Sequence, residues 1–441
     1  MDKNAAAKRS RLETMFAIPL AERIGRTALI VGTFDTKGRE LNFLRDRLRA
    51  LGIKTRTVDV STSGKPSAAD VLPAQVASAH PLGGGAVFSG DRGSSVAAMA
   101  DAFARWIEGE RDIGGIISAG GSGGTSLVTS GMRKLAVGVP KIMISTIASG
   151  DVGRYVGASD IMMLHSVADV QGLNSITERV LGNGAHALAG MIAQLPTREA
   201  SAARARAARP AIGITMFGVT TPCVQALAKR LEGDYDCLVF HATGTGGRAM
   251  ENLADSGLLT AMIDVTTTEI ADMCFGGVFA ADADRFGAAI RTRLPYVGSV
   301  GALDMVNFGP RAAVPEQFRN RKFVVHNPQV TLMRTTRDEN RVMGEWIAGR
   351  LNQMEGPVRF LLPENGVSAL DTPGQAFHDP EADNALFEAL EKNTRQSTQR
   401  RVERVAAHIN DEAFVGALAD AFSSVAPRRD TVKVTVKTER I

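Results

Sequence analysis

Short apolar runs recur along the chain, and each ends in glycine or a small polar residue before a stretch with helical periodicity. The runs are continuous rather than alternating, which is typical of parallel strands buried on both faces. In the first half the pattern predicts strands at 27–33, 55–60, 85–89, 115–119, 141–146 and 161–165. Helices are predicted between them, at 41–51, 94–106 and 175–194, with a further helix starting near Thr125. This alternation predicts a doubly wound α/β domain with a mostly parallel sheet.

The same rhythm restarts near residue 211, after an Ala/Arg-rich stretch that has no apolar stripe. Strands are predicted at 211–216, 237–241, 261–265, 296–300, 323–326 and 358–362, and a half-exposed strand at 432–437. Helices are predicted at 222–231, 248–256, 338–351, 382–392 and 411–422. A chain of 441 residues exceeds the usual size of one hydrophobic core. We therefore expect a second doubly wound α/β domain and a cleft between the two domains.

The predicted organisation has four parts. It comprises a tail or helix at 1–25, a first α/β domain at 26–195, a linker at 196–210 and a second α/β domain at 211–441.

The composition is that of an ordinary globular protein, with 44% hydrophobic and 22% charged residues. A formal net charge of +4 without a basic stripe gives no reason to expect a nucleic-acid partner. No apolar run approaches the ~20 residues that span a bilayer, and no secretory signal is evident, so we expect a cytoplasmic protein without a membrane partner. Three cysteines without paired spacing argue against a disulfide framework or a zinc site.

A glycine-rich turn follows the strand predicted at 115–119, and it consists of Gly120, Gly121, Ser122, Gly123, Gly124 and Thr125. Glycine lets a ligand approach the backbone closely, and the N–H groups at a helix start attract anions. The two hydroxyls would add donors for phosphate oxygens or ligands for a metal. The turn lacks the Gly-Lys-Ser/Thr of a Walker A motif and the spacing of the dinucleotide fingerprint. A tight connection that binds nothing therefore stays open as the alternative.

A second small-residue turn ends the first predicted strand, with Gly32, Thr33, Phe34, Asp35, Thr36 and Lys37. Ligands of open parallel sheets bind outside the carboxyl ends of the strands, so both turns are expected on one rim. Lys37 would neutralise a terminal phosphate, and Asp35 would hold Mg²⁺ or a ribose hydroxyl. The alternative is that Asp35 and Thr36 only cap the following helix.

The second half also carries polar residues at predicted strand ends, among them His241, Glu269, Asp304 and His326. Such a set on one rim suits acid–base chemistry or a divalent metal, although no compact metal-binding spacing is present. Both histidines are equally well explained as structural residues.

Another glycine-rich segment in the second half contains Gly246, Gly247 and Arg248, and it is a second candidate anion site. Arg248 would pair with a substrate carboxylate or phosphate. The segment would alternatively complete the nucleotide pocket from across the cleft, or serve as a plain connection.

These segments resemble a known family. The turn at 32–37 with the following Glu40, the turn at 120–125 and the strings at 241–251, 264–269, 301–309 and 326–335 carry the resemblance. They are similar to uncharacterised bacterial proteins related to the N-terminal, ATP-binding region of the tomato inhibitor of tobamovirus RNA replication. The resemblance covers roughly residues 25–425, and it implies two α/β domains, ATP binding by the first domain and dimerisation. Phe34 departs from the smaller residue usual in the family, and it either contacts the base or packs.

We therefore expect a homodimeric protein that binds ATP and Mg²⁺ on the rim of its first domain. The nucleotide would contact Gly32, Thr33, Asp35, Lys37, the turn at 120–125 and the segment at 246–248. The alternative is a metabolic enzyme that acts on a small polar metabolite in the interdomain cleft, through His241, Glu269, Asp304 or His326, and is ATP-dependent or metal-assisted.

Overall fold

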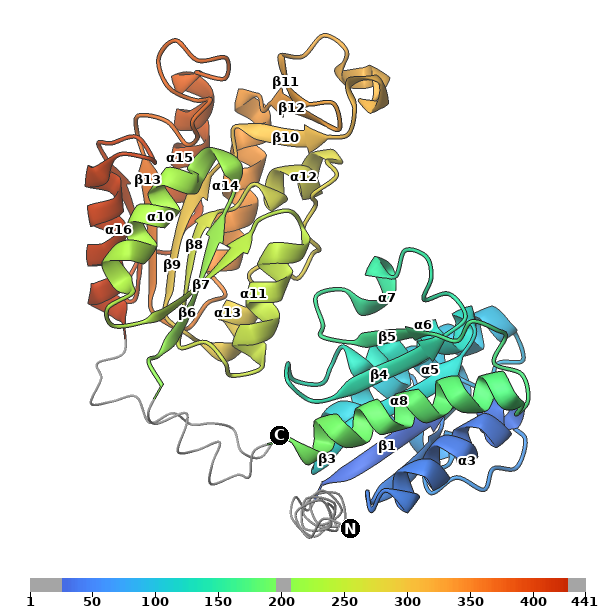
Figure 1. Ribbon diagram of the computed structural model, residues 1–441. Helices are drawn as coiled ribbons and strands as arrows, with labels where there is room; N and C mark the ends of the chain where they lie inside the picture. Colours follow the sequence, from blue (N-terminus) through green and yellow to red (C-terminus); the bar gives the residue numbers. More distant parts are fainter. Residues whose placement is uncertain (1–25, 196–207, 427–441) are drawn as a thin grey trace, which may run out of the picture. The chain divides into compact units, whose positions relative to one another are not determined.

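The computed structural model describes residues 26–195 and 208–426, which form two compact units divided near residue 206 (Figure 1). Three predicted segments lie wholly or mostly outside the described residues: the tail at 1–25, the linker at 196–210 and the strand at 432–437. Within the described ranges, no helix is both long and apolar enough to cross a membrane. The expected cleft between the domains stays a prediction.

The first domain has a five-stranded parallel sheet in the order β2-β1-β3-β4-β5. Its strands are β1 (Thr27–Gly32), β2 (Thr55–Asp59), β3 (Ile113–Gly120), β4 (Lys141–Ser145) and β5 (Met162–His165). From β1 the chain moves to β2 on one side and then crosses to β3 on the other. The strand order therefore reverses between β1 and β3, which is where doubly wound sheets bind ligands.

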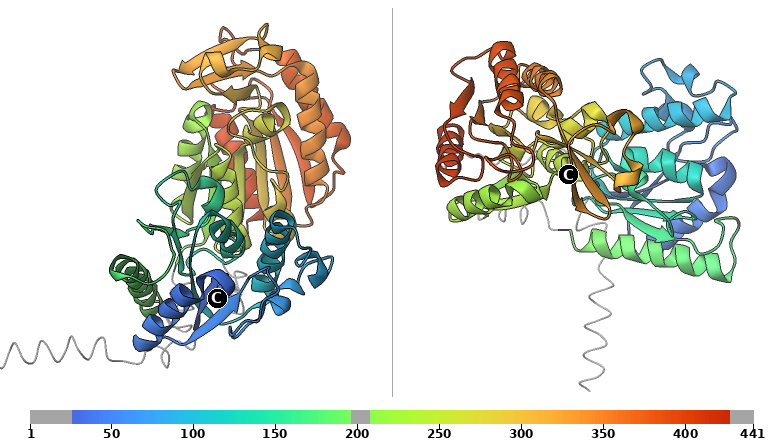
Figure 2. Two further views of the ribbon diagram at one scale, coloured as in Figure 1. Left: turned by 90° about the vertical axis from the view of Figure 1, so that its right-hand side faces the viewer. Right: turned by 90° about the horizontal axis from the view of Figure 1, so that it is seen from above.

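Helices cover both faces of this sheet (Figure 2). The four longer ones are α3 (Phe34–Ala50), α5 (Arg92–Gly109), α6 (Ser122–Met132) and α8 (Ser175–Ala193), and the short ones are α4 (Pro73–Ala77), η1 (Gly84–Ala86) and α7 (Gly153–Val156). One apolar cluster joins the sheet to α3 and α8, and another joins it to α5 and α6. All eight residues of β3 are buried because this central strand is covered on both sides.

The strand predicted at 85–89 is wrong. Residues there form η1 and the loop that leads into α5, and only Val87 of that run is fully buried. The flanking glycines and Ser89 leave too short an apolar run to form a buried strand. The helix predicted near Thr125 begins earlier, at Ser122, so two of the glycines lie in its first turn.

The second domain has a six-stranded parallel sheet in the order β14-β13-β9-β8-β6-β7. Its strands are β6 (Ala211–Met216), β7 (Asp236–His241), β8 (Ala261–Thr266), β9 (Tyr296–Gly301), β13 (Val358–Pro363) and β14 (Arg400–Val405). Its α-helices are α10 (Thr221–Leu231), α11 (Thr245–Asp255), α12 (Glu269–Phe275), α13 (Gly287–Thr292), α14 (Arg337–Leu351), α15 (Pro380–Asn393) and α16 (Glu412–Val425), and its short 3-10 helices are η2 (Gly218–Thr220), η3 (Arg311–Ala313) and η4 (Glu316–Phe318). Its first five strands follow the same order as those of the first domain. The predicted fold class, two doubly wound domains with mostly parallel sheets, is confirmed.

A small antiparallel sheet is inserted between β9 and α14 (Figure 1). It contains β10 (Met305–Phe308), β12 (Val330–Arg334) and β11 (Phe323–Asn327), in that spatial order. The run predicted at 323–326 is a strand, but the expectation that it joins the parallel sheet is wrong. Met305 and Leu332 of this small sheet pack with Phe217, which follows β6, and with Ala302, which follows β9. The inserted sheet therefore covers part of the carboxyl edge of the second domain.

Candidate functional site

The glycine-rich turn lies at the start of α6, beside the point where the strand order reverses. Gly121 is the N-cap residue and makes no side-chain capping bond, and the first intrahelical bond runs from the N–H of Thr125 to the carbonyl of Gly121 at 2.9 Å. The N–H groups of Ser122, Gly123 and Gly124 therefore have no acceptor within the helix. Together with the helix dipole, they form a positively polarised end at the carboxyl edge of the sheet.

Neither conformation nor packing within the domain requires glycine in this turn. None of its four glycines has a positive φ, the main reason that a turn needs glycine. A Cβ at Gly123 or Gly124 would meet no atom within 4 Å, and one at Gly120 or Gly121 would have its nearest contact at 3.7 or 3.8 Å. The missing side chains therefore leave open space above the first turn of α6.

The two hydroxyls of the turn differ in their surroundings. Thr125 is buried, and its Oγ1 donates to the carbonyl of Gly121 at 2.8 Å and lies 2.6 Å from the Oγ of Ser145 at the end of β4. It thus ties α6 to the sheet. Ser122 is exposed and leaves its hydroxyl accessible at the helix start.

The turn after β1 is tied to the end of β2. The N–H of Phe34 donates to Oδ1 of the buried Asp59 at 3.2 Å, so an acid from the neighbouring strand caps α3. Ser61 donates its hydroxyl to Asp35 at 2.9 Å and also contacts Asp59. Asp35 and Asp59 are thus held beside one another. Asp59 was missed in the sequence, although its place at the end of a predicted strand is the signal that would have found it.

The remaining residues of this turn are engaged within the domain. The hydroxyls of Thr33 and Thr36 lie 2.8 Å apart, and Phe34 packs against the apolar cluster under α3 and α8. The ammonium of Lys37 donates to the carbonyl of Val170, in the loop after β5. Gly32 is buried, and a Cβ there would lie 2.7 Å from Leu41. A side chain at Gly32 would therefore displace Leu41, and the role of Gly32 in the nucleotide site stays a prediction.

The second domain also has a glycine-rich helix start, that of α11. A side chain of the protein itself occupies it. Oε1 of the buried Glu269 accepts the N–H groups of Gly244 at 2.7 Å and Gly247 at 3.1 Å, at the start of α11. A Cβ on Gly247 would lie 2.1 Å from Glu269, and one on Gly246 only 1.8 Å from a backbone oxygen. Internal packing thus explains both glycines. Arg248 forms a partly exposed ion pair with Asp282 at 3.1 Å.

Glu269 belongs to a buried charge network centred on Arg285, whose side chain is 3% exposed. The guanidinium bonds to Glu251 at 2.9 Å, to Asp264 at 2.8 Å and to Glu269 at 3.0 Å. Burial lowers the pKa of Arg285, but the surrounding carboxylates outweigh burial and hold it well above its ordinary value. Burial also raises the pKa of Glu251. The network joins β8, α11 and α12. It was not predicted from the sequence.

The four candidate catalytic side chains lie in different environments. Asp304 is fully buried, and burial raises its pKa to about 7, while Ser368 donates a hydroxyl to it at 2.7 Å. His241 is exposed at the end of β7, with its ring 5.4 Å from that of Phe217, and His326 is exposed on β11 of the small sheet. Glu269 is committed to the Arg285 network. In the part of the chain that the structure describes, no three His, Cys, Asp or Glu side chains are grouped to hold a metal ion.

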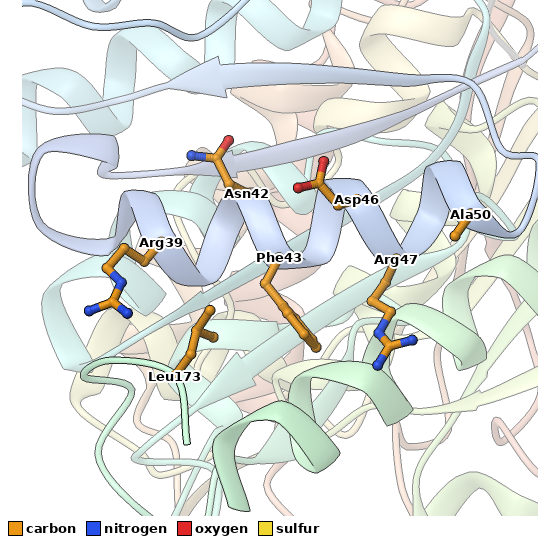
Figure 3. Close-up of a pocket in the computed structure, with 7 residues that line it drawn as sticks. All are labelled: Arg39, Asn42, Phe43, Asp46, Arg47, Ala50 and Leu173. Carbon is orange, nitrogen blue, oxygen red and sulfur yellow. The ribbon is translucent and has the colours of Figure 1, made fainter. Parts of the chain in front are cut away.

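A shallow hollow lies elsewhere on the first domain, along the outer side of α3 (Figure 3). It is lined by Arg39, Asn42, Phe43, Asp46, Arg47, Ala50 and Leu173. The guanidinium of Arg47 lies 5.3 Å from the centre of the Phe43 ring. No residue of the predicted nucleotide site lines this hollow.

The chain is a protein of two doubly wound α/β domains, of which the first leaves a helix start open at its switch point. It belongs to the Uncharacterised protein family (UPF0261), whose N-terminal domain matches residues 26–197 and whose C-terminal domain matches residues 209–426. The resemblance seen in the sequence is thereby confirmed.

Three relatives illustrate the breadth of the family. A UPF0261 protein of Rhizobium meliloti is 54% identical, over 90% of this chain and 98% of its own length. A UPF0261 protein of Clostridium tetani is 41% identical, over 90% of this chain and 98% of its own length. The ToMV resistance protein Tm-1(GCR237) of Solanum lycopersicum is 43% identical, over 90% of this chain but only 55% of its own length. Among solved structures, an esterase domain from Rhodothermus marinus covers 50% of this chain at 12% identity and a TM-score of 0.27, which supports no statement about activity.

Proposed function

We propose that the first domain binds a nucleotide, ATP, through its phosphates at the start of α6. The observation that carries this proposal is the run of glycines at 120, 121, 123 and 124, which neither backbone conformation nor packing requires. A bound anion would require them, because its oxygens approach the backbone N–H groups more closely than a side chain at these positions would allow. The hydroxyl of Ser122 adds a further donor.

The contrast with the second domain supports the choice of site. Both domains have a glycine-rich helix start, although α6 follows the third strand of its domain and α11 follows the second. In the second domain the carboxylate of Glu269 accepts the helix-start N–H groups, and its glycines make room for that carboxylate. Helix-start N–H groups favour a negatively charged acceptor, and at the start of α6 an anion from outside the protein would fill that role.

Mg²⁺ would be held by Asp35 and Asp59. Mg²⁺ commonly binds through one or two carboxylates together with substrate phosphates. Ser61 holds both carboxylates at the end of β1 and β2, next to the strand that leads into α6. Lys37, which donates to Val170, would contribute its charge rather than a direct phosphate contact.

The test measures binding of ATP with Mg²⁺ to the full chain, by calorimetry and by the shift in thermal unfolding. A ligand at about 100 times its Kd stabilises the folded state by about 2.7 kcal/mol, which a thermal scan resolves easily. Gly123→Val should remove the stabilisation because the branched side chain fills the space above the helix start. Gly190→Val on α8 is the matched control, since a Cβ there also meets nothing within 4 Å. If wild type and Gly123→Val respond alike to ATP, the proposed site is wrong.

The alternative, a metabolic enzyme acting through His241, Glu269, Asp304 or His326, has no specific observation in its favour. Dimerisation also stays a prediction.

A further inference from the structure

Val167, two residues beyond the end of β5, has an unusual backbone conformation. Its φ is +65°, a region that β-branched residues very rarely adopt. The N–H of Ala168 donates to the carbonyl of Ser166 at 2.7 Å, which closes a three-residue turn of the strained, positive-φ kind. Glycine or asparagine would adopt this turn at lower cost.

Packing within the domain does not compensate for this strain. Val167 as a residue is 70% exposed. Phe286 provides the contrast, because it also has a positive φ, +70°, but is fully buried with its ring 5.7 Å from that of Tyr296. A strained, bulky residue that gains burial is understandable, whereas one that remains exposed needs another explanation.

The turn around Val167 is held in place from both sides. Ser166 donates its N–H to the carbonyl of Ser145 on β4 at 3.1 Å. Farther along the same loop, the carbonyl of Val170 accepts from Lys37, and the N–H of Gly172 donates to the buried Glu40. Both partners come from the first turns of α3, so the loop is fixed to the segment that follows β1.

Val167 lies on the same edge of the sheet as the glycine-rich turn. Thr146 donates its N–H to Gly120 at 3.3 Å, and Ser166 donates to Ser145, so hydrogen bonds link the ends of β3, β4 and β5 in sequence. Two strand spacings separate β3 from β5, which is about 10 Å. A nucleotide whose phosphates lie at the start of α6 spans such a distance with its sugar and base.

We propose that Val167 packs against the flat, apolar face of the nucleotide base and thereby sets the preference for a nucleoside triphosphate over an inorganic polyphosphate. Burial of the valine side chain by the ligand would supply the compensation that the domain itself lacks. This inference rests on the proposed function, because it places the phosphates at the start of α6.

The test compares ATP with inorganic tripolyphosphate, each with Mg²⁺, on wild type and Val167→Gly of the full chain. Loss of one apolar contact should weaken ATP binding about tenfold. Tripolyphosphate binding should not change, because it lacks a base. The melting temperature without ligand should stay the same or rise, because glycine relieves the positive φ.

Asp112→Gly is the matched control. Asp112 also has a positive φ, +57°, and directly precedes β3 at the opposite edge of the same sheet. Relieving its backbone strain should leave the affinity for both ligands unchanged. If Val167→Gly does not fold, Val167→Asn replaces it, since asparagine tolerates this conformation.

The outcomes separate the two proposals. Equal ATP affinity of wild type and Val167→Gly would overturn the role of Val167 and leave the phosphate site intact. If Val167→Gly bound ATP and tripolyphosphate with equally weakened affinity, the role of Val167 would also be overturned. The turn would then order the phosphate site without contacting the base. A wild-type protein that binds neither ligand would overturn the proposed function and this inference together.

Discussion

Replacing Arg285 by methionine is expected to destabilise the second domain strongly. The guanidinium bonds to Glu251, Asp264 and Glu269, all within 3.0 Å, and all three side chains are at most 8% exposed. Methionine fills a similar volume but leaves these carboxylates buried without a counter-charge. Breaking one buried pair typically costs about 3–5 kcal/mol, so with three partners we expect a loss of at least about 5 kcal/mol in the free energy of unfolding near neutral pH.

The loss should depend on pH in a defined direction. Burial raises the pKa of Glu251 and Arg285 opposes that rise, so without Arg285 the pKa of Glu251 in the folded state lies farther above that in the unfolded chain. Groups with raised pKa values stabilise the fold at low pH and lose that contribution as pH rises through the folded pKa. The deficit of Arg285→Met relative to wild type should therefore be smaller at about pH 5.5 than at about pH 7.5.

The assay uses the placement of the two tryptophans. Trp106 lies on α5 of the first domain and Trp346 on α14 of the second, 5.9 Å from the ring of Phe286. In a Trp106→Phe background, tryptophan fluorescence during urea unfolding reports on the second domain alone.

Arg291→Met is the matched control for this prediction. Arg291 lies on α13 and pairs with Asp255 at 2.7 Å and Asp284 at 2.8 Å, but its side chain is 48% exposed. Its loss should cost no more than about 1 kcal/mol, because water solvates the partners that remain. A deficit for Arg285→Met as small as that of the control, or one that grows as pH falls, would refute the reasoning.

Three further predictions concern particular residues of the two domains. Gly131→Ala should destabilise the first domain by about 1–3 kcal/mol, because the new Cβ would lie 2.3 Å from the ring of Phe103. Gly124→Ala should keep or slightly raise the stability of the first domain, measured by Trp106 fluorescence, and should weaken ATP binding, measured by calorimetry. Lower stability with unchanged ATP binding would contradict the ligand role of the turn. Burial raises the pKa of Asp304 to about 7, so the stability that Asp304 contributes should fall as pH rises from about 4 through about 7. Asp304→Asn should flatten that fall in urea unfolding, and an unchanged slope would contradict the assignment.

The sequence determined the repeating strand–helix order and therefore the fold class. Continuous apolar runs and helical periodicity are local properties, because backbone geometry fixes which positions of a segment share a face. The same reasoning located the turn after β3 and the polar residues at strand ends. It did not distinguish β11, in an antiparallel sheet, from the parallel strands, since a short apolar run looks alike in both.

Only the tertiary structure decided which of two similar glycine-rich helix starts is open. Both follow an apolar strand and precede a helix, and nothing local separates the turn at 120–125 from the segment at 244–248. The difference comes from Glu269, a side chain more than twenty residues farther along the chain from Gly244, whose carboxylate reaches the N–H groups of the second helix start. Arg285, Asp59 and Val167 became significant for the same reason. Their roles depend on contacts between distant segments and on backbone angles, which packing sets and sequence periodicity does not encode.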